Sequence, residues 1–254
     1  MTQRGAGPQA ALRASLSRRR EREAEPLLPF LQPDPAPAPS AAPVPPPPSG
    51  EAGPATTRRQ TLTGAFNDAA ELPFSLRLKD FEMAMQDVYD FLYDVNRSLL
   101  DKGLHRIDDM LRPAAMSGMI SDMLTASVAR HSRVLVENRH FNGHPDLVVQ
   151  GKYANNATAS GEHGIEIKST RKTGGAVDTH GARRQWMCVF VYRTDHATEP
   201  AEARAPMRFT EVYLALVEPS DFRRNPRGEL GTRTATLDRD GIRKLRANWI
   251  YRDA

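Results

Sequence analysis

The chain has 254 residues, which allows one large domain or two small ones, and its 35 basic residues slightly exceed its 31 acidic residues. This mild excess suits an anionic partner without identifying one, and the single cysteine excludes an internal disulfide framework and a thiolate zinc cluster. The chain has no apolar run of about 18 residues, and its first residues lack the apolar core of a secretory signal. We therefore expect no membrane span and a soluble protein in the reducing cytoplasm.

The N-terminal segment 1–60 differs in composition from the rest of the chain. Twelve of the 20 prolines lie between Pro26 and Pro54, in a stretch with almost no large apolar residue after Leu31. Such a segment cannot bury enough surface to offset its ordering entropy, so we expect a disordered, basic and proline-rich arm. A linker is the simplest role for this arm, and docking to a partner that recognises proline is the alternative. Residues 61–254, about 190 in number, are enough for one folded domain.

Two amphipathic helices come first in the predicted domain. From Leu78 to Leu99 apolar residues recur at spacings of three and four, and Gly103 follows as a helix terminator. The second helix has Pro113 in its first turn and continues to about Arg130. Its methionines recur at helical spacing, which is typical of core residues. Both helices are therefore expected to bury one face against the rest of the domain.

The apolar period changes to that of strands after the second helix. Five short apolar segments are predicted as strands, at 134–136, 147–149, 164–169, 186–192 and 209–217. The fourth is apolar throughout, which predicts a central position, and Cys188 in its middle is expected to be a core residue. A last helix is expected to begin near Asp240 and to carry Ile242 and Leu245, with Trp249 as its farthest candidate. This order of elements predicts an α/β domain around one central sheet.

Polar residues of two adjacent predicted strands form the most informative pattern. Side chains alternate along a strand, so the two isoleucines of segment 164–169 point into the core while Glu166 and Lys168 share the opposite face. Asp146 opens the preceding strand. If these two strands pair, Asp146 lies beside Glu166, and an acid pair and an amine meet at one point.

Two carboxylates that converge on one point repel each other unless a cation lies between them. Ligation by oxygen alone favours Mg²⁺, which can supply a hydroxide nucleophile and neutralise the charge on a scissile phosphate. The ammonium of Lys168 would position the attacking water and stabilise the transition state. The pattern therefore predicts Mg²⁺-dependent hydrolysis of a phosphodiester. The alternative is an ordinary strand with an exposed polar face, together with an aspartate that caps a turn.

The series Pro145-Asp146…Glu166-Ile167-Lys168 resembles the signature of the PD-(D/E)xK nuclease superfamily, which includes many type II restriction endonucleases. The resemblance covers about residues 113–217 and implies a restriction-endonuclease-like mixed β-sheet flanked by helices. It also implies that the aspartate and the glutamate are Mg²⁺ ligands and that the lysine lies at the attacking water.

Other residues near this signature are candidates to complete or line the site. The family often adds an acid from the helix before the first strand, where Asp122 is the candidate. Ile167, His180 and Gln185 lie close to the signature in sequence and can line the site. His144 can approach the metal, although a turn histidine beside a proline more often has no such role.

Basic residues surround the signature and point to DNA as the substrate. Between Arg139 and Arg193 the chain has eight basic residues and four acidic ones. The candidates for contacts with DNA phosphates are Arg171, Lys172, Arg183 and Arg184. We expect a Mg²⁺-dependent DNA endonuclease of the restriction type, and a homodimer, because double-strand cleavage requires two active sites. The alternatives are a repair or recombination nuclease of the same fold, an inactive DNA-binding module, and an interaction protein that acts through its proline-rich arm.

Overall fold

Seven strands form a mixed central sheet in the structure, a computed structural model that describes residues 59–175, 177–179, 181–224 and 234–253. In spatial order the strands are β1 (Ala65–Phe66), β10 (Trp249–Arg252), β7 (Arg208–Val217), β6 (Gln185–Arg193), β4 (Gly164–Thr170), β3 (Leu147–Val149) and β2 (Leu135–Glu137). The neighbours β4 and β6 are parallel, and the other neighbouring pairs are antiparallel. The expected class, an α/β domain around a mixed central sheet, is confirmed.

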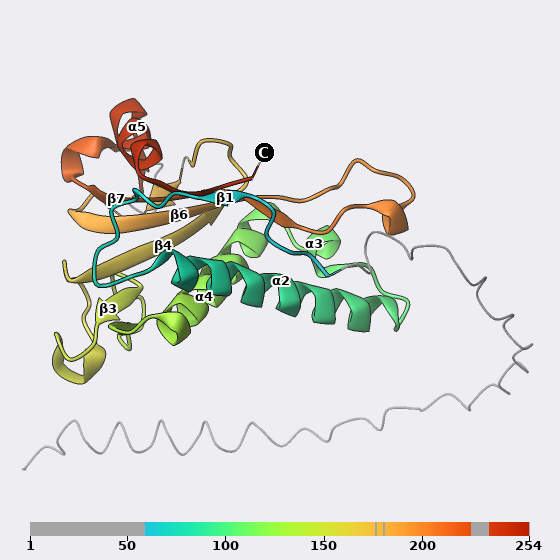
Figure 1. Cartoon of the computed structure of the whole chain (residues 1–254), viewed down its shortest axis with the longest axis horizontal. Coiled ribbons are helices and arrows are strands. Elements are labelled where there is room, and N and C mark those ends of the chain that lie inside the picture. The colour runs from blue at the N-terminus through green and yellow to red at the C-terminus, as the bar shows by residue number, and fades with distance from the viewer. Residues whose placement is uncertain (1–58, 176, 180, 225–233, 254) are drawn as a thin grey trace, which may run out of the picture. The chain divides into compact units, whose positions relative to one another are not determined.

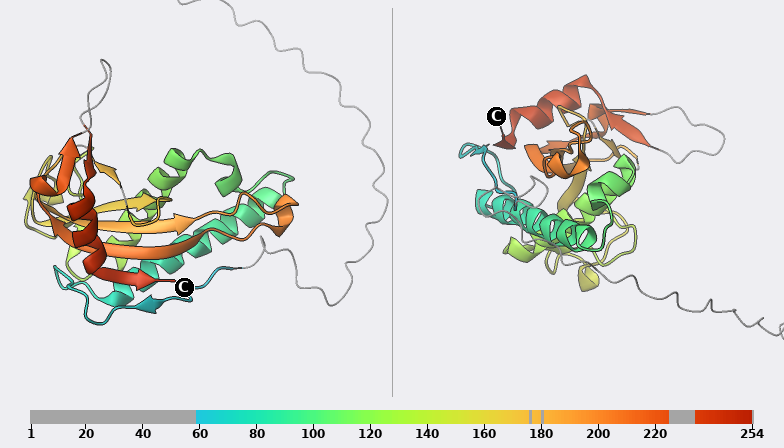
Figure 2. Two further views of the ribbon diagram at one scale, coloured as in Figure 1. Left: turned by 90° about the horizontal axis from the view of Figure 1, so that it is seen from above. Right: turned by 90° about the vertical axis from the view of Figure 1, so that its right-hand side faces the viewer.

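Helices cover both faces of this sheet (Figure 1). On one face lie the long helices α2 (Leu78–Leu100) and α4 (Pro113–His131), with the short α3 (Ile107–Met110) between them in sequence. On the other face lies α5 (Arg239–Ala247), and the end-on view in Figure 2 separates these layers. A second sheet contains β5 (Asp178–Thr179), β9 (Ala235–Leu237) and β8 (Phe222–Arg224). Three short 3-10 helices are η2 (Ala154–Asn156), η3 (Ala201–Ala203) and η4 (Pro219–Asp221).

Alternate residues of β6 pack into two separate cores. Cys188 and Phe190 belong to the core under α2 and α4, whereas Met187 and Val189 belong to the core shared by α5 and the second sheet. Because both faces of the strand are buried, its sequence is a nearly continuous apolar run. Burial also raises the pKa of the Cys188 thiol, in keeping with its expected place in the core.

The long predicted elements are confirmed, whereas β1, α3 and the second sheet were not predicted and the last helix is shorter than its farthest candidate. The last helix does not reach Trp249: α5 ends at Ala247, and Trp249 begins β10. Asn248 has a non-helical backbone, and its side-chain amide donates to the backbone oxygens of Glu71 and Leu214. The aromatic and β-branched residues that follow then pair with β7.

Two further expectations concern the N-terminal arm and the absence of a membrane span. Residues 1–58 of the arm lie outside the part of the chain that the structure describes. No helix within the described part is long and apolar enough to cross a membrane.

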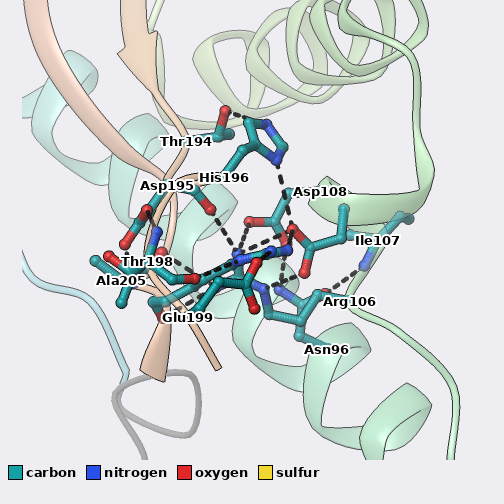
Figure 3. Close-up of polar contacts among 12 residues, drawn as sticks. Asn96, Arg106, Ile107, Asp108, Thr194, Asp195, His196, Thr198, Glu199 and Ala205 are labelled. Atoms are coloured by element: carbon teal, nitrogen blue, oxygen red, sulfur yellow. Dashed lines mark hydrogen bonds and ion pairs between the residues drawn. The ribbon is translucent and has the colours of Figure 1, made fainter. Parts of the chain in front are cut away.

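A buried arginine joins the loop at α3 to the loop between β6 and β7 (Figure 3). The side chain of Arg106 is 2 % exposed, and its guanidinium lies 3.2 Å from Asp108 Oδ2 and 3.1 Å from Asp109 Oδ2. The guanidinium also donates to three backbone carbonyl oxygens, those of Asp195, Arg204 and Ala205. We call this group the Arg106 cluster. The sequence pattern did not reveal it, because its members are scattered along the chain.

Candidate metal centre

Pairing of β3 with β4 brings Asp146 beside Glu166. The strands are antiparallel with Leu147 opposite Ile165, so the next position along the pair places Asp146 opposite Glu166. Gly164 permits this close pairing, because a Cβ at that residue would lie 1.9 Å from the carbonyl oxygen of Leu147. The condition for the sequence-based prediction, that these two strands pair, is therefore met.

Four side chains meet where these strands pair. Lys168 Nζ lies 2.7 Å from Glu166 Oε1 and 3.9 Å from Asp146 Oδ2. His144 Nδ1 lies 3.1 Å from Glu166 Oε2 and 3.2 Å from its Oε1. The backbone N–H of Ile167 donates to Asp146 Oδ2 at 2.7 Å, which orients that carboxylate. The structure thus brings together the three residues of the predicted triad and adds a histidine.

The two carboxylates have different electrostatic environments. Burial alone would raise the pKa of Glu166, which is 0 % exposed, but the hydrogen bond with His144 and the charge of Lys168 outweigh burial and lower the pKa to about 2. Burial and the negative charge of Glu166 raise the pKa of Asp146 to about 6. The positive groups at the site therefore outweigh burial at Glu166 but not at Asp146.

Lys168 remains an ammonium in this environment. Burial disfavours its charged form, but the negative charges of Glu166 and Asp146 outweigh burial and raise the pKa of the lysine. The lysine can therefore donate hydrogen bonds and offset negative charge, and it has no lone pair with which to act as a base near neutral pH.

The backbone around His144 is held on both sides. Its N–H donates to the carbonyl oxygen of Ala159 at 3.2 Å, and its carbonyl oxygen accepts from the N–H of Gly161 at 2.8 Å. The side chain of Asn138 donates to the carbonyl oxygen of Pro145 at 2.9 Å. The segment that carries the histidine and the aspartate is therefore fixed before any ligand binds.

A hollow of about 350 Å³ lies next to Lys168, at the end of β4 and the start of α4. The exposed residues Arg171 and Lys172 line it, and so does Pro113 in the first turn of α4. Two of the four predicted DNA-contacting residues thus share a solvent-accessible hollow with the lysine of the site. The glycine pair that follows serves packing, because Gly175 lies against the ring of Tyr213.

The other two predicted DNA-contacting residues have different surroundings. Arg183 lies close enough to Lys168 for its positive charge to oppose the charged form of the lysine. Arg184 is half exposed and forms ion pairs with Glu162 at 3.2 Å and with Glu218 at 3.1 Å. These two acids already balance its charge, so Arg184 is the weaker candidate for a phosphate contact.

Three further candidates are placed as follows. Asp122 is exposed on α4. This helix packs against the face of β4 opposite to Glu166, because the Ser169 side chain on that face donates to the backbone of Ser117. Asp122 is not among the converging ligand groups. The side chain of Ile167 is buried in the core, and only its backbone N–H serves the site. His180 lies outside the described residues.

The converging groups have the donor chemistry of a divalent metal site. Ligand atoms of His144, Asp146 and Glu166 all lie within 4.8 Å of one another, and among the described residues this is the one such group of histidine, cysteine and acidic side chains. Sequence analysis gave His144 little weight. The available signal was its nearness in sequence to Asp146.

Gln185 supplies a separate sign that a polar ligand belongs here. It is 1 % exposed, and neither atom of its side-chain amide has a hydrogen-bond partner among the described residues. Along β6, Gln185 and Met187 point to one face of the sheet and Trp186 points to the other. Met187 pairs with Glu166 of β4, so Gln185 lies on the face that carries Glu166. Buried amides without partners are rare, and a water or ligand on the face that carries the carboxylates would satisfy this one.

Comparison with known proteins adds no relative. No family model matches the chain, and neither the curated proteins nor the solved structures include a match. The geometry and chemistry of the site therefore carry the functional argument.

Proposed function

We propose that the chain is a metal-dependent DNA endonuclease of the PD-(D/E)xK type, with a restriction-endonuclease-like domain in residues 61–254. The observation that carries the proposal is the convergence of Asp146, Glu166 and Lys168 from two paired strands on one face of a mixed sheet. A divalent cation such as Mg²⁺, when bound to these carboxylates, supplies a hydroxide nucleophile and neutralises charge on the scissile phosphate.

Each residue of the triad has a role that its surroundings support. Glu166 is fully buried and ionised, so it offers a fixed negative oxygen to a cation. Asp146 is oriented by the N–H of Ile167 and is short of positive charge. Lys168, as an ammonium, hydrogen-bonds the attacking water and offsets the charge that develops on the phosphate.

The hollow beside Lys168 suits one strand of a DNA duplex. Arg171 and Lys172 on its wall would contact phosphates on either side of the scissile bond, which would position the backbone without reading bases. The described residues of one chain contain one candidate site, so cleavage of both strands would require a homodimer.

The experiment that tests this proposal is incubation of supercoiled plasmid with the full chain and Mg²⁺. We expect nicks or discrete fragments with the wild type, and for Lys168→Ala a loss of at least about 10²–10³-fold, as expected when one electrostatic stabiliser of a transition state is removed. Lys79→Ala is the matched control, because Lys79 is exposed on α2 and pairs with Glu82. Control and wild type should cleave equally.

Two results would contradict the proposal. Equal cleavage by wild type and Lys168→Ala would remove the site assignment. Binding of DNA without cleavage in the presence of Mg²⁺ or Mn²⁺ would identify an inactive DNA-binding module instead.

A further inference from the structure

His144 changes the donor set that the signature implies. From the position of its ring we propose that His144 Nδ1 is a direct metal ligand, and that the site therefore binds Mn²⁺ more tightly than Mg²⁺. This inference rests on the proposed function, since it assigns a third ligand and an ion preference to the same centre.

The distances match two ligands of one ion. Adjacent ligands of an octahedral ion at about 2.1 Å lie about 3.0 Å apart. His144 Nδ1 lies 3.1 Å and 3.2 Å from the two oxygens of Glu166. The carboxylate of Asp146 completes a group in which one atom of each residue lies within 4.8 Å of the others. An ion can therefore bind all three residues with little movement.

Backbone hydrogen bonds hold the segment that carries the imidazole, and the ring itself contacts Glu166. Hydrogen bonds to Ala159 and from Gly161 fix His144 on both sides of its Cα. A ligand that is already fixed loses little conformational entropy when the metal binds. His144 can therefore bind a metal ion with little loss of backbone conformational entropy.

A nitrogen donor alters the choice of ion. Mg²⁺ favours oxygen ligands and keeps several waters, whereas imidazole suits the first-row transition metals. Two carboxylates and one imidazole leave positions on the ion for water, and the unpartnered amide of Gln185 on the same face of the sheet can hydrogen-bond such a water. The donor set therefore favours a first-row transition metal over Mg²⁺, and Mn²⁺ is the probe of this preference because it also accepts carboxylate and water ligands.

Pulsed electron paramagnetic resonance of the Mn²⁺-loaded full chain tests this inference without measuring activity. An imidazole nitrogen bound to Mn²⁺ gives a ¹⁴N coupling, which should change when the protein contains ¹⁵N-histidine. His144→Asn should abolish the coupling while keeping a polar side chain next to Glu166. His163→Ala is the matched control, because His163 is an exposed histidine of the same β3–β4 connection, and it should keep the coupling.

Titration calorimetry gives the second readout. The wild type should bind Mn²⁺ at least about tenfold more tightly than Mg²⁺, and His144→Asn should lose about 10–100-fold in Mn²⁺ affinity, the range seen when groups that support metal ligands are removed. Its Mg²⁺ affinity should change less.

The outcomes separate this inference from the proposed function. If Mn²⁺ binds and supports cleavage but shows no histidine coupling, His144 is not a ligand and only the further inference fails. The same holds if the coupling persists in His144→Asn. If neither Mn²⁺ nor Mg²⁺ binds the wild type, the further inference and the proposed function fail together. The isotope comparison needs only the wild type, so the absence of a histidine coupling there overturns the inference even if a variant does not fold.

Discussion

The chain buries charged side chains in two places, and the two differ in whether their charges balance. In the Arg106 cluster, burial would raise the pKa of Asp109, but the hydrogen bonds and charges of Arg106 and Arg204 outweigh burial and lower it. At the candidate metal centre, burial and the charge of Glu166 raise the pKa of Asp146 to about 6. The positive groups around Asp109 therefore outweigh its burial, whereas those around Asp146 do not.

The difference indicates which group serves structure and which serves a ligand. The guanidinium of Arg106 contacts two carboxylates and three backbone carbonyls of the chain itself (Figure 3). Lys168 instead lines a solvent-accessible hollow, and its one ammonium faces two carboxylates. Buried acidic groups whose pKa is raised are typical of sites that bind a ligand.

The largest effect on stability is expected from Arg106→Met. Removal of one partner from a buried ion pair leaves uncompensated charges, so the free energy of unfolding should fall by about 3–5 kcal/mol, as measured by urea denaturation. Arg243→Met is the matched control, because Arg243 is exposed and pairs with the exposed Asp240. Its effect should stay below about 1 kcal/mol. Equal effects of the two substitutions would show that the Arg106 cluster is not a structural unit.

A smaller, pH-dependent effect is expected from Asp109. Its pKa in the folded chain is below the ordinary value of 3.8, so its ion pairs stabilise the fold above that pH and lose this contribution as the pH falls through the folded pKa. The wild type should therefore lose stability between about pH 5 and about pH 3 more steeply than Asp109→Asn. Urea denaturation at each pH measures the difference. Asp240→Asn should follow the wild-type profile, and an identical profile for Asp109→Asn would contradict the assignment.

Sequence periodicity predicted the long elements and the shared face of Glu166 and Lys168, whereas the strand pairing that brings Asp146 beside Glu166 was a condition that only the structure could meet. The alternation around Glu166 and Lys168 correctly predicted their shared face, because a strand with one apolar face has little freedom of register. The helical period did not predict that the last helix ends before Trp249. The C-cap of this helix is Asn248, whose side chain contacts residues far away in sequence.

The charge balance of the two clusters could not be predicted from the sequence either. The Arg106 cluster joins loops that are about 90 residues apart, and a sequence window contains no sign of such a contact. The role of His144 depends on where its ring lies relative to Glu166, which the strand pairing decides.

The central claim is that positive charge does not compensate Asp146 until a cation binds at the centre. Thermal unfolding of the wild type and Asp146→Asn, in EDTA and in Mn²⁺ or Mg²⁺, tests this claim most directly. The bound ion should raise the melting temperature of the wild type, with a stabilisation of about 2.7 kcal/mol when the ion exceeds its Kd 100-fold. Asp146→Asn should show no such rise, and in EDTA it should melt no lower than the wild type, because it removes the repulsion between two carboxylates. A wild type that does not respond to either ion, or an Asp146→Asn protein that melts well below the wild type in EDTA, would contradict the account.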